Sequence, residues 1–159
     1  MTTRVGLGVD AHSLKPSRPL ILGGIHVPFR KGLSGHSDGD VVVHAIMDAL
    51  LGAAGLGDKG QHFPSTNPAL KGISSLALLA KVGSLLTDNG WQIVNLDATI
   101  LAQQPRLTPF VNDMMKKIAA TLKTDFANIH LKATTTDHLG FTGREEGISA
   151  YAVVLIKAN

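Results

Sequence analysis

Residues 41–55 read VVVHAIMDALLGAAG, and this stretch decides how the rest of the chain has to pack. It is long enough for a helix, with Ser37 or Asp38 as the expected N-cap and Gly55 at the expected end. Apolar residues occupy nearly every face of that helix, so it is expected to be buried on most sides. Other elements therefore have to surround it.

Strand and helix patterns follow one another on both sides of this stretch. Two short strands are expected to form a hairpin turned at Gly23–Gly24 within residues 19–29. The other expected strands cover residues 4–10, 91–103, 128–136 and 148–158, and the other expected helices cover residues 72–90 and 108–123. Residues 137–147 read as a loop. The prediction is an α/β (α+β) protein, a single domain over residues 1–159 with a mixed β-sheet and helices packed on one face.

The composition fits one domain with a mild positive charge. Of the 159 residues, 44% are hydrophobic, the formal net charge is +3 and there is no cysteine. The basic residues are scattered without interleaved aromatic residues, which argues against a nucleic-acid groove, whereas a small anionic ligand suits this charge. No apolar run reaches the roughly 20 residues of a membrane span, and the N-terminus lacks a signal-peptide layout. We expect a soluble, cytoplasmic protein (stromal, if processed in a plastid), with no membrane or nucleic-acid partner.

A carboxylate and two imidazoles stand out within the apolar segments. In VGLGVDAHSL, residues 5–14, Asp10 and His12 are two apart and share one face of a strand. In the buried helix, His44 and Asp48 are four apart and share a helical face. Two histidines and an aspartate from two segments make a three-ligand set suited to zinc, with a fourth position open for water or substrate. Asp48 would then accept a hydrogen bond from His44 and orient it.

Each of these residues also has a plain structural explanation. His12 fits a surface histidine at the end of a strand, and His44 fits a core histidine bonded to Asp48 or to a backbone carbonyl. Gly8 fits a position where another element packs closely. The D-x-H spacing with a distant histidine does not by itself choose between these explanations and a metal site.

Longer motifs carry a family resemblance that covers nearly the whole chain in order. They are GLSGHSDGDVVVHAIMDALLGAAGLGDKGQHFP at residues 32–64, LDATILAQQPRL at residues 96–107 and KATTTDHLGFTGREEGI at residues 132–148. With GVDAH at residues 8–12, they closely resemble the 2-C-methyl-D-erythritol 2,4-cyclodiphosphate synthases of the non-mevalonate (MEP) isoprenoid pathway. That family of phosphorus–oxygen lyases cyclises 4-diphosphocytidyl-2-C-methyl-D-erythritol 2-phosphate to the 2,4-cyclodiphosphate and releases CMP.

The resemblance implies a metal-dependent homotrimer with the three sheets around a central axis and active sites between subunits. It places zinc (Zn2+) on Asp10, His12 and His44. It places magnesium (Mg2+) or manganese (Mn2+) on the substrate's phosphates, in contact with Asp137, where members of the family usually have glutamate.

The resemblance also implies which residues contact the substrate. His36 and Thr135 would stabilise the transition state. The remainder of the substrate would contact Ser37, Asp58, Gly60, Phe63 and Asn67. The cytidine pocket would be formed by Ala102, Pro105, Arg106, Leu107, Thr134, Thr135 and Thr136.

Phe141 and Arg144 match a cavity near the trimer axis that can take an isoprenoid diphosphate in this family. Leu7 stands where some members have a histidine of that cavity, which weakens the case for this ligand. Arg144 equally fits an ion pair with Glu145 or Glu146.

The sequence departs from the family pattern in the loop FPSTNP, residues 63–68, where Ser65 and Asn67 replace two carboxylates. Arg106 stands where lysine is frequent. Two other functions share part of the pattern: a metal-dependent phosphoryl hydrolase, which should lack the cytidine segments, and a trimeric isoprenoid diphosphate binder, which does not need the metal ligands. The presence of both features favours the synthase.

Overall fold

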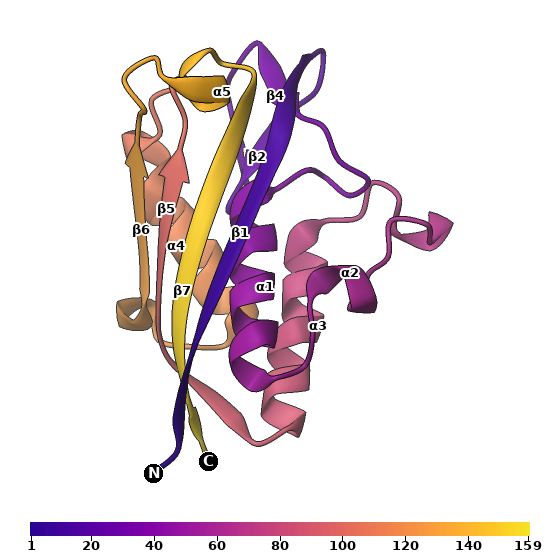
Figure 1. The fold of residues 1–159 in the computed structure, drawn as a ribbon, viewed down its shortest axis with the longest axis vertical. Helices are drawn as coiled ribbons and strands as arrows, with labels where there is room; N and C mark the ends of the chain where they lie inside the picture. Colours follow the sequence, from indigo (N-terminus) through magenta and orange to yellow (C-terminus); the bar gives the residue numbers. More distant parts are fainter.

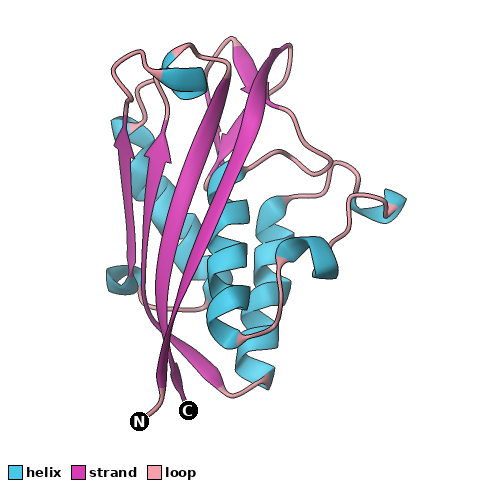
Figure 2. Ribbon diagram, in the orientation of Figure 1, coloured by secondary structure: helices cyan, strands magenta, loops and turns pink.

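A computed structural model describes residues 1–159, and a mixed five-stranded sheet forms its centre (Figures 1 and 2). The strands lie in the order β4-β1-β7-β5-β6. Their bounds are β1 Thr3–Pro16, β4 Lys31–Leu33, β5 Trp91–Leu101, β6 Ile129–Thr134 and β7 Gly147–Ala158. β5 and β6 are parallel, and the other neighbours are antiparallel. The mixed sheet confirms the predicted fold class.

Three long helices cover one face of this sheet, as the sequence predicts (Figure 2). They are α1 Val41–Ala54, α3 Ser75–Asp88 and α4 Thr108–Leu122. The predicted hairpin forms between β2 Leu20–Leu22 and β3 Ile25–Val27. The short elements are α2 Lys59–His62, η1 Pro68–Leu70, η2 Phe126–Asn128 and α5 Gly140–Gly143. α5 lies within residues 137–147, which the sequence predicted as a loop. None of the helices combines the length and the apolar character needed to cross a bilayer.

Helix α1 lies at the centre of the core, against β1 and β7. Twelve of its fourteen residues are buried, as its apolar composition predicts. Gly6 and Gly8 of β1 face this helix. A Cβ atom on Gly8 would lie 1.9 Å from the carbonyl oxygen of Ala45, and one on Gly6 would lie 2.0 Å from that of Ala49. The helix can therefore approach the strand this closely only because both positions are glycine.

The N-terminus of α1 is capped by Asp40, which corrects the first of two predictions about where helices start. The sequence predicted Ser37 or Asp38, but the carboxylate of Asp40 accepts the backbone N–H of Val43. The same carboxylate accepts N–H groups from both hairpin glycines, Gly23 and Gly24. Burial raises the pKa of Asp40 to about 6, although these N–H donors favour the charged form.

The second correction concerns α4. The sequence TPF at residues 108–110 predicts Thr108 as its cap and Pro109 as its first residue. In the structure Thr108 is the first residue of α4, and Leu107 takes the cap position. The difference is one residue, within the usual scatter of helix ends.

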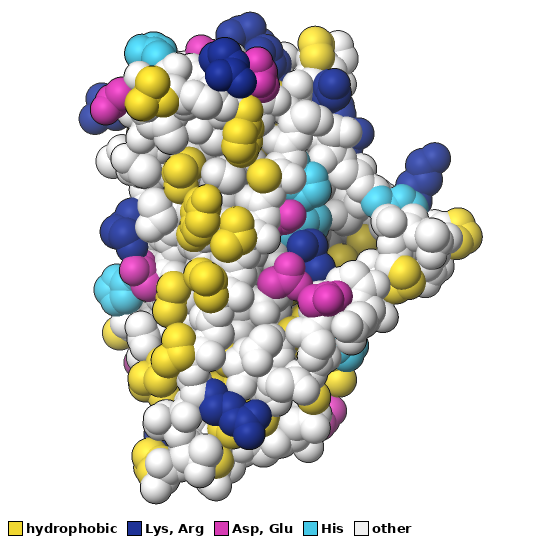
Figure 3. Space-filling model, in the orientation of Figure 1, with side chains coloured by type: hydrophobic (Ala, Val, Ile, Leu, Met, Phe, Trp, Pro, Cys, Tyr) yellow, Lys and Arg dark blue, Asp and Glu magenta, His cyan; other side chains and the backbone are white.

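The face of the sheet away from the helices carries a band of exposed apolar side chains (Figure 3). It is formed by Val5, Leu7, Val9, Tyr151 and Val153, each 45–67% exposed. We call this set the apolar band. It alternates with buried residues on β1 and β7, so within one chain each of these strands is covered on one face only.

Candidate active site

Strand β1 and helix α1 bring Asp10, His12 and His44 together, as the sequence predicts. Asp10 and His12 lie on the face of β1 that Gly6 and Gly8 turn toward α1. Oδ2 of Asp10 lies 2.8 Å from Nε2 of His12 and 3.0 Å from Nδ1 of His44. The two imidazole nitrogens are themselves 3.0 Å apart. Three potential ligand atoms therefore converge on one point.

This cluster has a donor set that suits zinc, and its spacing is close to that of a zinc site. Zinc binds imidazole nitrogen and carboxylate oxygen at about 2.0–2.2 Å, so tetrahedral ligand atoms lie about 3.4 Å apart. The separations of 2.8–3.0 Å need an increase of only a few tenths of an ångström to admit the ion. The side chain of His44 is 8% exposed and those of Asp10 and His12 are 16% and 19% exposed, which leaves one side of the cluster open.

The carboxylate of Asp10 is held in its charged form. Burial alone would raise its pKa, but hydrogen bonds with His12 and His44 and the nearby Lys59 ammonium hold the pKa of Asp10 well below its usual range. Asp10 is therefore an anionic ligand throughout the physiological pH range.

The second nitrogen of His44 is oriented by serine hydroxyls, and not by Asp48 as the sequence predicted. Nε2 of His44 lies 2.9 Å from Oγ of Ser75 and 3.0 Å from Oγ of Ser37. Ser75 in turn donates its hydroxyl to the carboxylate of Asp38. This chain fixes the ring so that Nδ1 faces Asp10.

Asp48 binds Lys59, which lies at the start of α2. Its Oδ1 accepts the backbone N–H of Lys59 at 2.7 Å, and its Oδ2 accepts the Lys59 ammonium at 2.8 Å. The ammonium also lies 3.6 Å from Oδ1 of Asp10. Burial lowers the pKa of Lys59, but the contacts with Asp48 and Asp10 raise it more, so the group stays charged.

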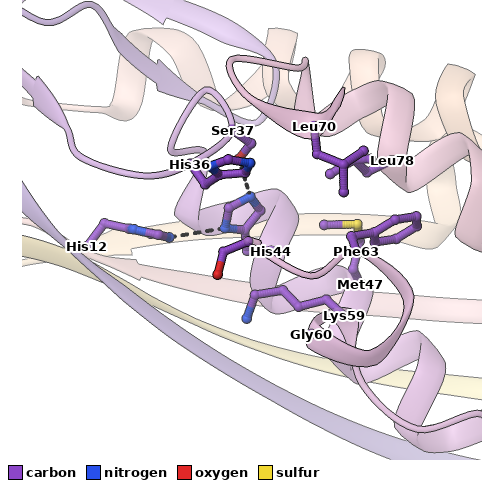
Figure 4. Close-up of a pocket in the computed structure, with 11 residues that line it drawn as sticks. His12, His36, Ser37, His44, Met47, Lys59, Gly60, Phe63, Leu70 and Leu78 are labelled. Atoms are coloured by element: carbon purple, nitrogen blue, oxygen red, sulfur yellow. Dashed lines mark hydrogen bonds between the residues drawn. The ribbon is translucent and has the colours of Figure 1, made fainter. Parts of the chain in front are cut away.

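A cavity of about 230 Å³ opens beside Asp10, His12 and His44 (Figure 4). We call these three residues the metal cluster and this cavity the metal cavity. Several residues expected to contact the substrate line it, with His12 and His44 of the metal cluster at one side. The lining comprises His12, His36, Ser37, His44, Met47, Lys59, Gly60, Phe63, Ser65, Leu70 and Leu78. Nε2 of His36, which lines this cavity, lies 2.9 Å from the backbone carbonyl oxygen of Asn67. The cavity is therefore polar at the metal end and apolar at the other.

Asp58 lies beside this cavity but is not part of its lining. It caps α2 and accepts the N–H of Gln61, and the residue as a whole is exposed. The side-chain oxygen of Asn67 likewise caps η1 by accepting the N–H of Ala69. The amide of Asn67 therefore caps this loop without a carboxylate.

The expected cytidine residues line a second, separate cavity of about 170 Å³. It lies between the end of β5 and the end of β6, and comprises Ala102, Gln103, Gln104, Pro105, Arg106, Leu107, Thr108, Ala133, Thr134 and Thr135. Thr136 is not in this lining and bonds the carbonyl of Leu139 instead. Asp137 is exposed beside it, with Oδ1 3.3 Å from Oγ1 of Thr135. The two cavities share no lining residue, and Thr135 follows β6, which β7 and β5 separate from β1. One chain therefore does not bring Thr135 to the Asp10–His12–His44 cluster.

Phe141 and Arg144 lie at the α5 end of the sheet, outside both cavities. The guanidinium of Arg144 donates two hydrogen bonds to the carboxylate of Glu146, at 2.9 and 3.2 Å. This is the ion pair that the sequence offered as the alternative to ligand binding.

The sequence did not single out Ser75, Lys59 or Asp38 as site residues. Ser75 follows another serine at a helix start, where capping explains it, and nothing local distinguishes it. Lys59 stands between Asp58 and Gly60 in a turn. A lone lysine beside an aspartate is too common to serve as a signal.

The sheet, its single helical layer and the Asp-His-His cluster define a class of α/β protein with a candidate metal centre at the junction of strand and helix. Comparison with known proteins is consistent with this class. Residues 3–157 match the model of the YgbB family. A 2-C-methyl-D-erythritol 2,4-cyclodiphosphate synthase of Pelotomaculum thermopropionicum is 54% identical over 153 residues, covering 96% of this chain and 94% of its own.

Two solved structures share the fold. The bifunctional IspDF of Campylobacter jejuni superimposes with a TM-score of 0.96 at 40% identity, over 99% of this chain and 43% of its own. The CDP complex of Plasmodium falciparum IspF superimposes with a TM-score of 0.87 at 30% identity, over 99% and 97%. The chain belongs to the YgbB family, and within it to the 2-C-methyl-D-erythritol 2,4-cyclodiphosphate synthases.

Proposed function

We propose that this chain converts 4-diphosphocytidyl-2-C-methyl-D-erythritol 2-phosphate to 2-C-methyl-D-erythritol 2,4-cyclodiphosphate and CMP. The observation that carries the proposal is the convergence of Asp10, His12 and His44 beside a cavity, in a member of a synthase family. Structural explanations of the two histidines do not account for three ligand atoms within about 3 Å of one another.

The metal ligands define the end of the cavity where phosphate chemistry takes place. Zinc, when bound by Asp10, His12 and His44, supplies an open position that can hold and polarise a phosphate oxygen. Magnesium or manganese, with Asp137 among its ligands, would neutralise charge on the phosphates of the leaving group. The exposed carboxylate of Asp137 offers the hard oxygen that these ions prefer.

The reaction depends on positioning of the two phosphate groups more than on proton transfer. An oxygen of the 2-phosphate forms a bond to the β-phosphorus, and the bond from that phosphorus to the oxygen of CMP breaks. CMP leaves with the electron pair. Because the 2-phosphate is already anionic at neutral pH, no strong base is required. His36 and Thr135 can donate hydrogen bonds to the phosphate oxygens, and Ser37 adds a hydroxyl from the same loop as His36.

The other contacts follow from the two cavities. We assign the methylerythritol part to the region of Asp58, Gly60 and Phe63, because Gly60 and Phe63 line the metal cavity and a carboxylate can accept hydroxyl protons. We assign the cytidine part to the second cavity, from Ala102 to Leu107 and at Thr134. A CDP complex of the Plasmodium falciparum relative supports a cytidine nucleotide as ligand.

We further propose a homotrimer whose sheets face a common axis and whose active sites form between subunits. Two observations support it. Thr135 lines the second cavity and not the metal cavity, and Asp137 lies beside it, so a site that uses them together with the zinc ligands would take them from another copy. The apolar band on β1 and β7 leaves Val5, Leu7 and Val153 uncovered, and oligomerisation would remove this apolar surface from water.

Phosphorus NMR of the protein with the cytidyl substrate tests the proposal directly. Cyclic diphosphate and CMP should form, stop forming after chelation and return when zinc and magnesium are added. His44→Ala should lose zinc and turnover while the folded protein persists, and His26→Ala, at an exposed position on β3, should retain both. Wild-type activity in His44→Ala would show that the metal assignment is wrong.

A further inference from the structure

The metal cavity contains one ammonium group that the proposed reaction has not yet used, that of Lys59. The side chain is 27% exposed and runs along the cavity wall, with its ammonium end toward His12 and His44 (Figure 4). Asp48 fixes both ends of this residue, because one carboxylate oxygen accepts its backbone N–H and the other accepts its ammonium. A long, flexible side chain is therefore held in one place.

The charges around Lys59 show what that placement does. Its ammonium lies 2.8 Å from Oδ2 of Asp48 and 3.6 Å from Oδ1 of Asp10. Oδ1 is the outer oxygen of Asp10, since Oδ2 faces the two histidines. The carboxylates of Asp10 and Asp48 and the ammonium of Lys59 together carry one negative charge, and a bound divalent ion would change this sum to one positive charge. Without the ammonium, the metal-loaded group would be neutral.

An ammonium has three N–H donors. Asp48 takes one by hydrogen bond, and Asp10 lies too far for a normal hydrogen bond. At least one donor is thus left for a ligand in a cavity whose polar end is otherwise formed by imidazoles and hydroxyls. An anionic oxygen brought to the open side of the metal cluster is the ligand that suits it.

We propose that Lys59 is a substrate-binding cation of this cavity: it donates to the phosphate group that occupies the open side of the metal cluster, and Asp48 and Asp10 hold it there. The identity of that phosphate as part of a diphosphate rests on the proposed function. A purely structural role, as a clip that fastens α2 to α1 through Asp48, is the competing explanation.

The two explanations differ in what happens to zinc and to phosphate. Removing a positive charge close to a cation site tightens binding of the cation and weakens binding of an anion. We expect Lys59→Met to bind zinc at least tenfold more tightly and to bind inorganic pyrophosphate, in the zinc-loaded protein, at least tenfold more weakly. Lys59→Arg keeps the charge and should stay within about threefold of the parent in both.

Zinc affinity is measured by competition with a chromogenic chelator, and pyrophosphate affinity by isothermal titration calorimetry. Lys116→Met is the matched control, because Lys116 is an exposed lysine on α4 that pairs only with Asp113. Lys59→Gln carries the same test should the methionine variant fail to fold. Where turnover is measurable, KM should rise with the pyrophosphate dissociation constant.

Opposite shifts of zinc and pyrophosphate affinity, with the arginine variant near the parent, support the proposal. A pyrophosphate affinity unchanged within twofold in Lys59→Met overturns it, and a fall in stability with both affinities unchanged assigns Lys59 to the structural clip. Neither readout requires turnover, so a chain that fails to cyclise its substrate can still pass or fail this test.

Discussion

Replacing Gly8 by alanine tests whether the close contact of β1 with α1 sets the metal geometry. The added Cβ would lie 1.9 Å from the carbonyl oxygen of Ala45, whereas an ordinary carbon–oxygen contact is about 3.3 Å. The helix backbone cannot rotate away, so α1 has to shift by about 1.4 Å on this comparison. Such overpacking costs about 3 kcal/mol, equivalent to a fall in the unfolding midpoint of about 6–12 °C in a domain of this size.

The same shift separates His44 from Asp10 and His12, because the contact lies between the two elements that carry them. Disturbing the orientation of metal ligands costs about 10–100-fold in metal affinity, so zinc affinity should fall by about that range. Thermal unfolding of the chelated protein at fixed concentration gives the first quantity, and chelator competition gives the second.

Gly52→Ala provides the control, because Gly52 lies in α1, the helix that Gly8 contacts. Nothing lies within 4 Å of a Cβ at Gly52, so alanine should raise stability by about 0.5–1 kcal/mol. If the free energy of unfolding of Gly8→Ala is within about 0.5 kcal/mol of the parent's and zinc affinity is equal, then the close contact at Gly8 does not set the geometry of the metal ligands.

Three further outcomes are expected. Ser75→Ala removes the partner of His44 Nε2 and should lower zinc affinity by about 10–100-fold in the same competition assay, whereas an unchanged affinity would mean that Ser37 alone orients the ring. Thr135→Ala should lower turnover with unchanged zinc content by atomic absorption, and loss of zinc would place Thr135 among the metal ligands. The pKa of Asp40 is raised from 3.8 to about 6, so the folded state takes up a proton at a higher pH than the unfolded chain does. The free energy of unfolding, relative to that of Asp40→Asn, should therefore increase as the pH falls from 7 to 4. A decrease in chemical denaturation experiments would contradict the raised pKa of Asp40.

The sequence predicted the metal cluster because its geometry is local in two elements. Alternation along β1 puts Asp10 and His12 on one face, and the apolar composition of α1 places His44 in the core. Only the contact between the two elements was needed to bring the three together. The sequence offered close packing as the explanation of Gly8, which the contact with α1 confirms, but it singled out neither Gly6 nor the helix that packs there.

The partner of Asp48 could not be predicted in the same way. A spacing of four residues puts Asp48 on the His44 face of the helix, but it does not show which group the returning chain presents there. Residues 56–59 turn back along α1 and bring the backbone and ammonium of Lys59 to Asp48, so His44 finds its partner in Ser75 instead. The separation of the two cavities likewise depends on tertiary packing, and only the folded chain reveals it.

The pairing of β1 with β7 has a consequence for the order in which the segments of this chain can be connected. Thr3 lies opposite Lys157, and the backbone N–H of Ala158 bonds the carbonyl of Thr2, so the first and last residues meet at one end of the sheet (Figure 1). Asp10 lies about 23 Å further along β1, at about 3.3 Å per residue. A short peptide can therefore close the ends, with new termini cut between the exposed residues Asp88 and Asn89, where α3 leads to β5. The order of the segments is then permuted while β1 still meets α1.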